Sequence, residues 1–311
     1  MDKEKKRKEG PLVSVIVPHY RAFGLIPVLL ESIPTDERLE LLVIDDKSED
    51  RQKVKELAEK VQKRGGIFLE NISGKKGAGV CRNLGLDAAK GKWILFADAD
   101  DYFVEGAFDI IFSYTDAEED QVCFRPCSIL KGGNEPGRRH LRYEKLVRNY
   151  VSEPDRLHEL ELRYKFYGPV SRLIRNEMIR EHGIRFEEIR SSEDVMFSAM
   201  AGFYAKSVRA ADACIYCIVC SQDSLSTVHD RERFLLGARV DARYCRFLQE
   251  HLPRSDYRLL SAGGWKFIYM ALKDNYGIRT AFEVYKMMKE EGVSLGFVNA
   301  CRNKFFSGKR S

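Results

Sequence analysis

The chain of 311 residues has room for one large domain, or for one domain with a small appendage. Its 44% hydrophobic and 32% charged residues suit a folded protein with a substantial core and argue against a disordered chain. No apolar stretch reaches the length of a membrane span. The opening "MDKEKKRKEG" is charged rather than apolar, so we expect no secretory signal and a cytoplasmic protein.

The net charge of +5 is unevenly distributed. Residues 1–11 form a basic N-terminal tail, whose first ten residues carry five Lys/Arg against three acids. The final "CRNKFFSGKRS" has four basic residues, no acid and two adjacent phenylalanines. Basic residues beside aromatic ones suit an anionic membrane surface. A solvated, frayed terminus is the competing interpretation.

Strand-like runs alternate with helix-like segments over about residues 11–105. The strands are apolar on both faces, which is typical of a parallel sheet covered by helices on both sides. We therefore predict a doubly wound α/β half. The expected strands are 12–17, 39–44, 66–70 and 93–97, and the expected helices are 24–33, 50–64 and 78–90.

The pattern changes beyond residue 105. We expect a strand at 121–130, then an exposed turn and a long amphipathic stretch over about 141–182. The segment "RSSEDVMFSAMAGFYA" and a strand near 213–220 follow. From about 231 onward the pattern is mostly helical and rich in Leu, Tyr, Phe and basic residues.

Polar residues follow three of the four predicted parallel strands. In an open parallel sheet, ligands bind outside the carboxyl ends of the strands. A single polar strand end could be a helix cap, and capping of the helix near residue 50 competes at the second strand. Three polar ends on one rim favour a binding crevice. The residues are Pro18, His19 and Tyr20, then Asp45, Asp46 and Ser48, and finally Asp98, Asp100 and Asp101.

The segment "ADADD" places three carboxylates after the fourth strand. On an extended segment Asp98 and Asp100 share one side, and Asp101 faces the other. Two carboxylates on one side favour a bound cation, and hard oxygen ligands suit Mg²⁺ or Mn²⁺. Such an ion would in turn hold a diphosphate. An acidic turn after a strand is the alternative for this short motif.

Three of the eight cysteines, Cys214, Cys217 and Cys220, have a spacing similar to that of iron–sulfur ligands. The residues between them are strand formers, and both a fourth ligand and the glycines of a cluster loop are missing. Cysteine is among the most buried residue types. We therefore interpret this run as a core strand. Without a secretory signal, eight cysteines also argue against a disulfide framework.

Four segments, taken together and in order, resemble the inverting GT-A glycosyltransferases of family 2, in the branch that builds bacterial surface glycans. They are "VSVIVPHYRAFGLIPVLLESI", "LELLVIDDKSED", "GAGVCRNLGLDAAKGKWILFADADD" and "GIRFEEIRSSEDVMFSAMAG". The resemblance is strong over 12–105, clear over 165–228 and weak beyond. It implies a GT-A catalytic domain over 12–228, with a Rossmann-like, mostly parallel sheet and flanking helices. Residues 12–105 would bind the nucleotide-sugar, 106–228 the acceptor, and 229–311 would form a helical region facing the membrane or the acceptor.

The resemblance also implies roles for individual residues. The donor site would comprise Pro18 and Tyr20 around the nucleoside, Asp45 or Asp46 on the base, and Arg82 near the diphosphate or base. Asp98 would reach the ribose or the metal, and Asp100 would be the main metal ligand. Asp194 would be the general base with Glu193 beside it, taking a proton from the acceptor hydroxyl. Ser191 or Ser192 as N-cap would place Asp194 in a first helical turn, where the dipole lowers its pKa.

The sequence departs from the family pattern in several places. Residues 19–21 read His-Tyr-Arg where relatives usually carry Asn, and Lys75 stands at a position that is commonly Asn. "GPVSRLI" replaces a segment that often contains Lys, which leaves the acceptor side open. His229 matches a late polar residue near the metal, although a lone histidine is more often structural.

We therefore predict a metal-dependent inverting glycosyltransferase that uses a nucleotide-sugar, expected to be a UDP-sugar, with Mn²⁺ or Mg²⁺. The acceptor would be a growing, lipid-linked glycan at the cytoplasmic membrane face, and no nucleic acid is expected. The alternatives are a non-catalytic nucleotide-binding relative and a nucleotidyltransferase. The latter class usually has a Gly-rich basic loop after its first strand, where this chain has "VPHYRAFG".

Overall fold

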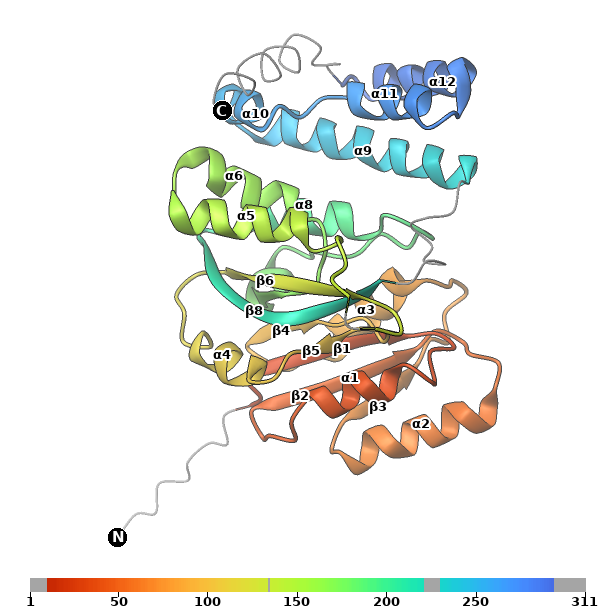
Figure 1. Cartoon of the computed structure of the whole chain (residues 1–311), viewed down its shortest axis with the longest axis vertical. Helices are drawn as coiled ribbons and strands as arrows, with labels where there is room; N and C mark the ends of the chain where they lie inside the picture. The colour runs from red at the N-terminus through yellow and green to blue at the C-terminus, as the bar shows by residue number, and fades with distance from the viewer. Residues whose placement is uncertain (1–9, 134, 221–229, 294–311) are drawn as a thin grey trace.

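The computed structural model describes residues 10–133, 135–220 and 230–293. These residues contain an eight-stranded mixed sheet in the order β3-β2-β1-β4-β7-β6-β8-β5, with helices on both faces (Figure 1). The strands are β1 (Val13–His19), β2 (Leu39–Asp45), β3 (Ile67–Glu70), β4 (Trp93–Phe96), β5 (Tyr102–Phe103), β6 (Gln121–Leu130), β7 (Arg172–Arg175) and β8 (Val208–Cys220).

The first half of the sheet is parallel, as the alternation of strands and helices predicts. β1 pairs in parallel with β2 and with β4, and β2 pairs in parallel with β3. The helices between these strands lie close to their predicted ranges, which confirms the doubly wound half. They are α1 (Ile26–Ser32), α2 (Arg51–Lys63) and α3 (Ala78–Ala88).

Two apolar layers cover the faces of the sheet. One face packs against α1, α2 and α4 (Ala107–Ser113), through residues such as Leu29, Val61 and Ile111. The other face packs against α3, α5 (Leu141–Ser152), α6 (Arg156–Lys165), α7 (Asn176–Glu181) and α8 (Asp194–Tyr204). Because both faces are covered, the central strands are apolar on both sides, as their sequences indicate.

The second half of the sheet differs from the expectation in one respect. Residues 141–182 do not form one amphipathic stretch, because α5 and α6 are followed by strand β7, which pairs antiparallel with both β4 and β6. β7 has only four residues, and three of them are buried, so it lacks the alternation that would mark a strand. The short strand β5 and helix α4 were not predicted either. β8 begins earlier than expected, at Val208.

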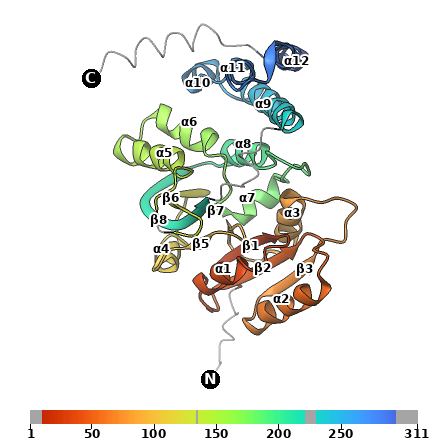
Figure 2. The same cartoon turned by 45° about the vertical axis from the view of Figure 1, so that its right-hand side comes forward.

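The described C-terminal region is helical, as predicted. It comprises α9 (Arg231–His251), α10 (Arg254–Leu260), α11 (Trp265–Lys273) and α12 (Gly277–Glu290). Figure 2 shows these helices as a layer beyond α5, α6 and α8. Within the described residues, no helix is both long and apolar enough to cross a membrane.

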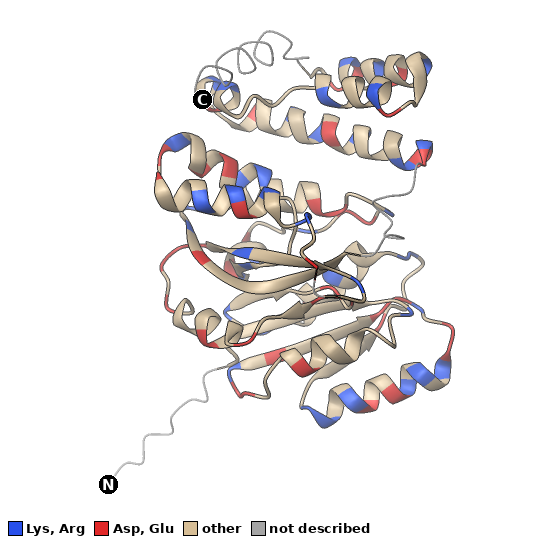
Figure 3. Cartoon of the chain, viewed as in Figure 1, with Lys and Arg blue, Asp and Glu red and all other residues tan. Residues whose placement is uncertain are grey.

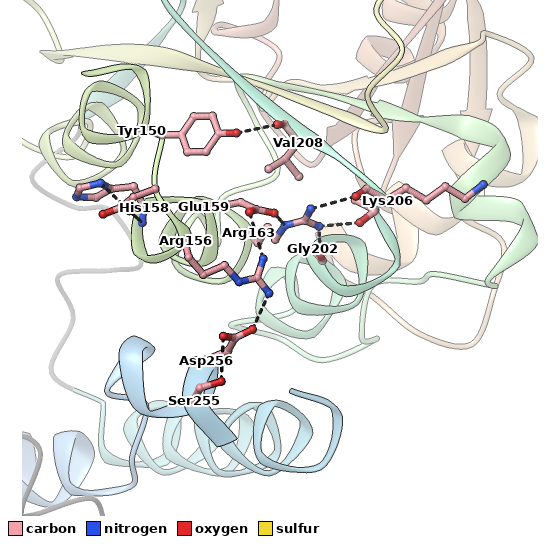
Figure 4. A network of polar contacts seen from close by, with 12 residues as sticks. Tyr150, Arg156, His158, Glu159, Arg163, Gly202, Lys206, Val208, Ser255 and Asp256 are labelled. Carbon is pink, nitrogen blue, oxygen red and sulfur yellow. Dashed lines mark hydrogen bonds and ion pairs between the residues drawn. The ribbon is translucent and has the colours of Figure 1, made fainter. Parts of the chain in front are cut away.

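A buried arginine holds the C-terminal end of α8, and a second arginine links α6 to the C-terminal helices (Figure 4). Arg163 donates to the carbonyls of Gly202 at 2.9 Å and Ala205 at 2.7 Å. Carbonyls at the end of a helix have no partner within the helix, so this side chain satisfies them. Arg156 donates to Asp256 of α10 at 2.6 Å. Helix α6 therefore connects the C-terminal layer to α8, the helix that begins at Asp194.

Candidate active site

The carboxyl ends of β1 and β2 meet at one edge of the sheet. His19 lies opposite Asp45 in the parallel register, and the amide of Asp46 donates to the His19 carbonyl at 2.7 Å. The neighbouring β4 ends at Phe96, and the amide of Ala97 continues the pairing to Ile16 of β1. The predicted polar strand ends therefore share one rim, as parallel pairing requires.

Asp45 and Asp46 both bind groups of the protein. The fully buried Asp45 accepts from His19 Nδ1 at 2.8 Å and from the Ser48 amide at 2.8 Å. Burial alone would raise the pKa of Asp45, but these hydrogen bonds lower it below its ordinary value. Asp46 accepts from Asn71 at 2.7 Å and from the Gly77 amide at 2.8 Å. In this geometry Asp45 fixes the end of β1, and Asp46 fixes the loop 71–77.

The polar segment after β2 also contains the N-cap of helix α2, but the capping residue is neither Asp45 nor Asp46. Asp50 accepts from the Lys53 amide and is the N-cap of α2. Asp45 and Asp46 are therefore not the cap.

Lys75, Tyr20 and Pro18 lie around this rim. Lys75 forms an ion pair with Glu188 at 2.6 Å, which joins the loop 71–77 to the segment 187–193. Tyr20 is 43% exposed, with the Lys76 ammonium 4.4 Å from its ring centre. Pro18 is half-buried at the end of β1. The role of these three residues in binding a nucleoside stays a prediction. His229, the predicted metal ligand, lies outside the described residues.

The carboxylates of 98–101 are arranged by a turn rather than by an extended segment. The Asp101 amide donates to the Asp98 carbonyl at 3.1 Å, which closes a four-residue turn after β4. The strand alternation that we expected is therefore wrong for this segment. Asp101 still points away from the rim, because it is buried and accepts from the Val219 amide at 2.8 Å. Burial, followed by Asp98 and Asp100, raises the pKa of Asp101 to about 8.

Tyr216 of β8 holds this turn and was not predicted to have a role. Its buried hydroxyl accepts from the Asp98 amide at 2.8 Å and is also hydrogen-bonded to Asp101. The residue lies 118 positions from Asp98 in sequence, inside the cysteine-bearing strand. No local pattern marks it, because only the pairing of β5 with β8 brings it to the turn.

Asp98 and Asp100 form the part of the acidic turn that fits a cation. Asp98 uses one oxygen to accept from Arg82, and the Asp100 carboxylate accepts from its own backbone amide. Burial and the charge of Asp98 raise the pKa of Asp100. The oxygens left without donors are hard ligands, and a divalent cation would relieve the repulsion between the two carboxylates. The residues present therefore fit the implied metal.

Arg82 connects this turn to the predicted catalytic pair. Its fully buried guanidinium donates to Asp98 at 2.7 Å and to Glu193 at 2.9 Å. Burial alone would lower the pKa of Arg82, but Asp98 and Glu193 raise it above its ordinary value. We expected Arg82 to contact the donor. In this structure two of its nitrogens are engaged by carboxylates, so it acts as a bridge between the two acidic segments.

Asp194 is the first residue of α8, and its environment differs from the expected one. Neither Ser191 nor Ser192 caps the helix, because Glu193 is the N-cap and Ser192 has a left-handed φ of 64°. The pKa of Asp194 is raised to about 6, not lowered. Burial is the main cause and Glu193 the second, while Arg82 acts in the opposite direction. Desolvation therefore outweighs the helix dipole at this position.

Helices α3 and α9 hold the segment 187–193 from two sides. A Cβ added to Gly79 of α3 would collide with the Glu187 carbonyl, so the helix can approach this closely only with glycine there. From α9, Arg243 forms a two-point ion pair with Glu187, and Arg233 donates to Ser191 at 3.0 Å. These contacts fix the backbone on which Glu193 and Asp194 stand.

Two other groups of potential metal ligands have structural roles in the described part of the chain: the cysteines of β8, and a group of side chains near the start of α6. Cys214, Cys217 and Cys220 lie on strand β8, which confirms the predicted strand. Cys217 is buried in the core, whereas Cys214 and Cys220 are half-buried. In the described part of the chain, Glu153, Asp155 and His158 are the one group of three metal-capable side chains close together. They lie between the C-cap of α5 and the first turn of α6, where Asp155 accepts from the His158 amide and His158 donates to the Glu153 carbonyl.

Comparisons with known proteins agree with this geometry. A model described as "Glycosyl transferase family 2" matches residues 14–183. The chain therefore belongs to glycosyltransferase family 2. The predicted membership of family 2 and the predicted resemblance to its GT-A transferases of bacterial surface-glycan synthesis are confirmed.

Among curated relatives, "Putative glycosyltransferase EpsH" of Bacillus subtilis is 26% identical over 260 residues, covering 80% of this chain and 73% of the relative. "Uncharacterized glycosyltransferase EpsJ" of the same organism is 30% identical over 227 residues, covering 70% of this chain and 64% of the relative. The chain spans only about a third of TarS, a poly(ribitol-phosphate) beta-N-acetylglucosaminyltransferase of Staphylococcus aureus.

Among solved structures, S. aureus TarS 1–349 in complex with UDP-GlcNAc superposes with a TM-score of 0.58 at 19% identity. The match covers 94% of this chain and 92% of that one. The mannosyltransferase PcManGT of Pyrobaculum calidifontis, in complex with GDP-Man and Mn²⁺, superposes with a TM-score of 0.57 at 15% identity, covering 97% and 82%. At these identities the likeness establishes the GT-A fold.

Proposed function

We propose that the chain is a metal-dependent inverting glycosyltransferase that takes its sugar from a UDP-sugar. The observation that carries this proposal is the Arg82 bridge between Asp98 and Glu193. It joins the carboxylates suited to a metal and diphosphate to the acid pair at the start of α8. In such a site the base can remove the proton of an acceptor hydroxyl, whose oxygen then attacks the anomeric carbon of the donor and displaces the diphosphate.

In this proposal Asp194 removes the proton from the acceptor hydroxyl as that oxygen attacks. With a pKa of about 6, Asp194 is largely ionised at neutral pH and is basic enough to accept a proton. Glu193, anchored by Arg82, positions the backbone of Asp194. When held by Asp98 and Asp100, Mn²⁺ or Mg²⁺ supplies positive charge against the departing diphosphate.

The donor side in this proposal is residues 12–105, with Pro18, Tyr20 and Lys75 at its rim and Asp45 and Asp46 shaping its floor. The UDP class is supported by the UDP-GlcNAc complex of TarS, and the metal by the Mn²⁺ complex of PcManGT. GDP-sugars are the competing donor class, because the PcManGT complex contains GDP-Man.

The acceptor in this proposal is a growing lipid-linked glycan, bound by residues 106–228 at the inner face of a membrane. A Campylobacter jejuni relative, 35% identical over 127 residues, is named as a glucosyltransferase acting on a GalNAc(5)-diNAcBac-PP-undecaprenol glycan. The helical region 229–311 would face the membrane or the acceptor. The basic segment 302–311, also expected to dock there, lies outside the described residues.

The test is release of UDP or GDP from a panel of nucleotide-sugars, with Mn²⁺, with Mg²⁺ and with EDTA. One sugar should be turned over only with metal, and Asp194→Asn should retain donor binding while losing turnover. NMR of the product would establish whether the anomeric configuration inverts. Binding without turnover by wild type would favour the nucleotide-binding alternative.

A further inference from the structure

The outer side of α11 and α12 carries apolar side chains that are unusually exposed. Exposed fractions are 49% for Tyr269 and 53% for Leu272 on α11, and 78% for Ile278 and 56% for Phe282 on α12. With Lys286 and Lys289 these residues form what we call the α11–α12 face. We propose that the α11–α12 face binds an anionic lipid surface. This proposal rests on the proposed function only for the lipid-linked nature of the acceptor.

The residues of this stripe follow a helical period; Ile278, Phe282 and Lys289 are exposed, and Tyr285 is half-buried. On α12, Ile278, Phe282, Tyr285 and Lys289 are spaced by four, three and four residues, which places them on one side of the helix. The opposite side carries Thr280, Ala281, Val284 and Met288, which are all buried. Helix α12 therefore packs on the rest of the protein through these buried residues, and the outer stripe takes no part in that packing.

Helix α11 repeats the arrangement. Trp265, Tyr269 and Leu272 are spaced by four and three residues, with the rings of Trp265 and Tyr269 6.0 Å apart. Ala271, on the other side, is buried. Lys266 and Lys273 are exposed and follow the stripe by one position, as Lys286 follows Tyr285 on α12. An exposed helix face in a folded domain is normally polar, so two apolar stripes on neighbouring helices indicate a partner.

The charges on these helices favour an anionic partner. Residues 265–290 carry five basic and three acidic side chains, visible as blue and red segments in Figure 3. One of the acids, Glu283, is engaged by Arg231 of α9 at 2.7 Å. The Lys286 ammonium lies 5.1 Å from the Phe282 ring centre, and that of Lys289 lies 6.0 Å from the Tyr285 ring centre.

Aromatic rings flanked by lysines suit the boundary between lipid head groups and acyl chains. The rings enter the apolar region, and the ammonium groups meet the phosphates. A second copy of this chain would instead bring like charges together. Lipid is therefore the better match among the surfaces that could cover this face.

The experiment is flotation of the full chain with phosphatidylglycerol/phosphatidylcholine vesicles, compared with pure phosphatidylcholine vesicles, at low and high salt. We expect binding to the anionic vesicles, weakened by salt. Both Ile278→Ser/Phe282→Ser and Lys286→Glu/Lys289→Glu should weaken binding about tenfold. The matched controls are Val28→Ser on α1 and Lys55→Glu/Lys60→Glu on α2, which are exposed in the same way and should bind like wild type.

Tryptophan fluorescence provides a second readout. The chain has two tryptophans, and Trp93 is fully buried, so a blue shift on adding anionic vesicles would report Trp265. The proposal is overturned if wild type does not bind anionic vesicles, or if the two α12 variants bind as tightly as wild type. Binding lost only on truncating residues 302–311 would overturn it as well, as would α12 variants that convert a dimer to a monomer in light scattering.

Nucleotide-sugar turnover separates this proposal from the proposed function. The α12 variants should release UDP in solution at the wild-type rate, because none of these residues belongs to the site around Asp194. A protein that binds vesicles but turns over no nucleotide-sugar would retain the docking surface and lose the enzymatic assignment. A protein with the opposite behaviour would retain the activity and lose the docking surface.

Discussion

Arg82 donates a 2.9 Å hydrogen bond to Glu193, a residue 111 positions further along the chain. The same guanidinium donates to Asp98, so a single buried cation ties the turn after β4 to the start of α8. The two halves of the candidate site are therefore mechanically connected, and a change at one carboxylate alters the partner available to the other.

Replacing Arg82 should affect both folding and catalysis. We expect Arg82→Met to lower the free energy of unfolding by about 2–4 kcal/mol, slightly below the range for a fully buried pair because Asp98 is partly exposed. Arg185→Met removes an exposed ion pair with Asp87 and should cost less than about 1 kcal/mol. Urea unfolding of the two variants measures the difference, and equal costs would show that the bridge is not structural.

The activity should depend on the ionisation of Asp194. Because its pKa is raised to about 6, kcat/KM should be constant above that pH and fall about tenfold per pH unit below it. Asp194→Asn should lower the rate of sugar transfer at least about a hundredfold, while the affinity for the donor stays close to that of wild type. A pH profile of the wild type, with donor binding followed by calorimetry, tests both statements. A profile with its inflection near pH 4 would contradict the raised pKa.

Asp194 should also destabilise the fold at neutral pH. The folded state holds its proton more tightly than the unfolded state, whose ordinary value is 3.8, so stability falls as pH rises from about 4 to 6. Asp194→Asn removes this penalty and should stabilise the protein at pH 8 by about 2–3 kcal/mol. The gain should disappear below pH 4. Thermal unfolding at both pH values measures it, and a gain that does not vary with pH would argue against ionisation as its cause.

Variants of the neighbouring residues Asp100 and Asp101 should affect different properties: metal dependence of the activity in the first case and stability in the second. Asp100→Ala should lose the stimulation by Mn²⁺ that EDTA removes from wild type, without loss of stability. Burial and Asp98 raise the pKa of the Asp100 carboxyl, so its charge destabilises the folded state at neutral pH. Asp101→Ala should cost about 1–3 kcal/mol, because the buried Val219 amide loses its acceptor. Asp101→Asn should recover most of that loss, since an amide oxygen also accepts. Turnover with and without EDTA, together with urea unfolding, distinguishes the three variants.

Arg163 should be critical for the helix that carries Asp194. We expect Arg163→Met to cost about 2–4 kcal/mol, because carbonyls at the end of α8 lose their donor. The matched control Arg246→Met removes surface ion pairs with Glu250 and Glu291 and should cost under about 1 kcal/mol. Unfolding monitored by circular dichroism measures both. Similar costs would indicate that other groups satisfy those carbonyls.

The parallel half of the fold could be predicted because its signals are local. A run such as 39–44 is apolar throughout and is followed by acids, and these features place both the strand and its carboxyl end. Strand β7 could not be predicted, because four residues are too few to show a period, and its place depends on antiparallel pairing with β4 and β6. Its assignment required the tertiary structure.

In the candidate site, too, the features with local sequence signals could be predicted, and those that depend on tertiary contacts could not. The acidic residues could be found from their position after strands, but their partners could not. Tyr216 and Arg82 reach Asp98 through contacts between distant segments, and the raised pKa of Asp194 arises from burial that no spacing reveals. The expected dipole effect at Asp194 was wrong because a local rule was applied to a position whose energetics are set by desolvation.

The two edges of the sheet have a consequence for handling the protein at high concentration. β3 has four residues, so its edge offers few free backbone groups to another chain, whereas β5 pairs with β8 only at Tyr216 and Cys217. Long open edges recruit further strands and begin aggregation, whereas edges this short recruit them poorly. Molecules crowded together on a surface can therefore remain separate at the β3 edge, and the 13-residue strand β8 forms the edge at which association would begin.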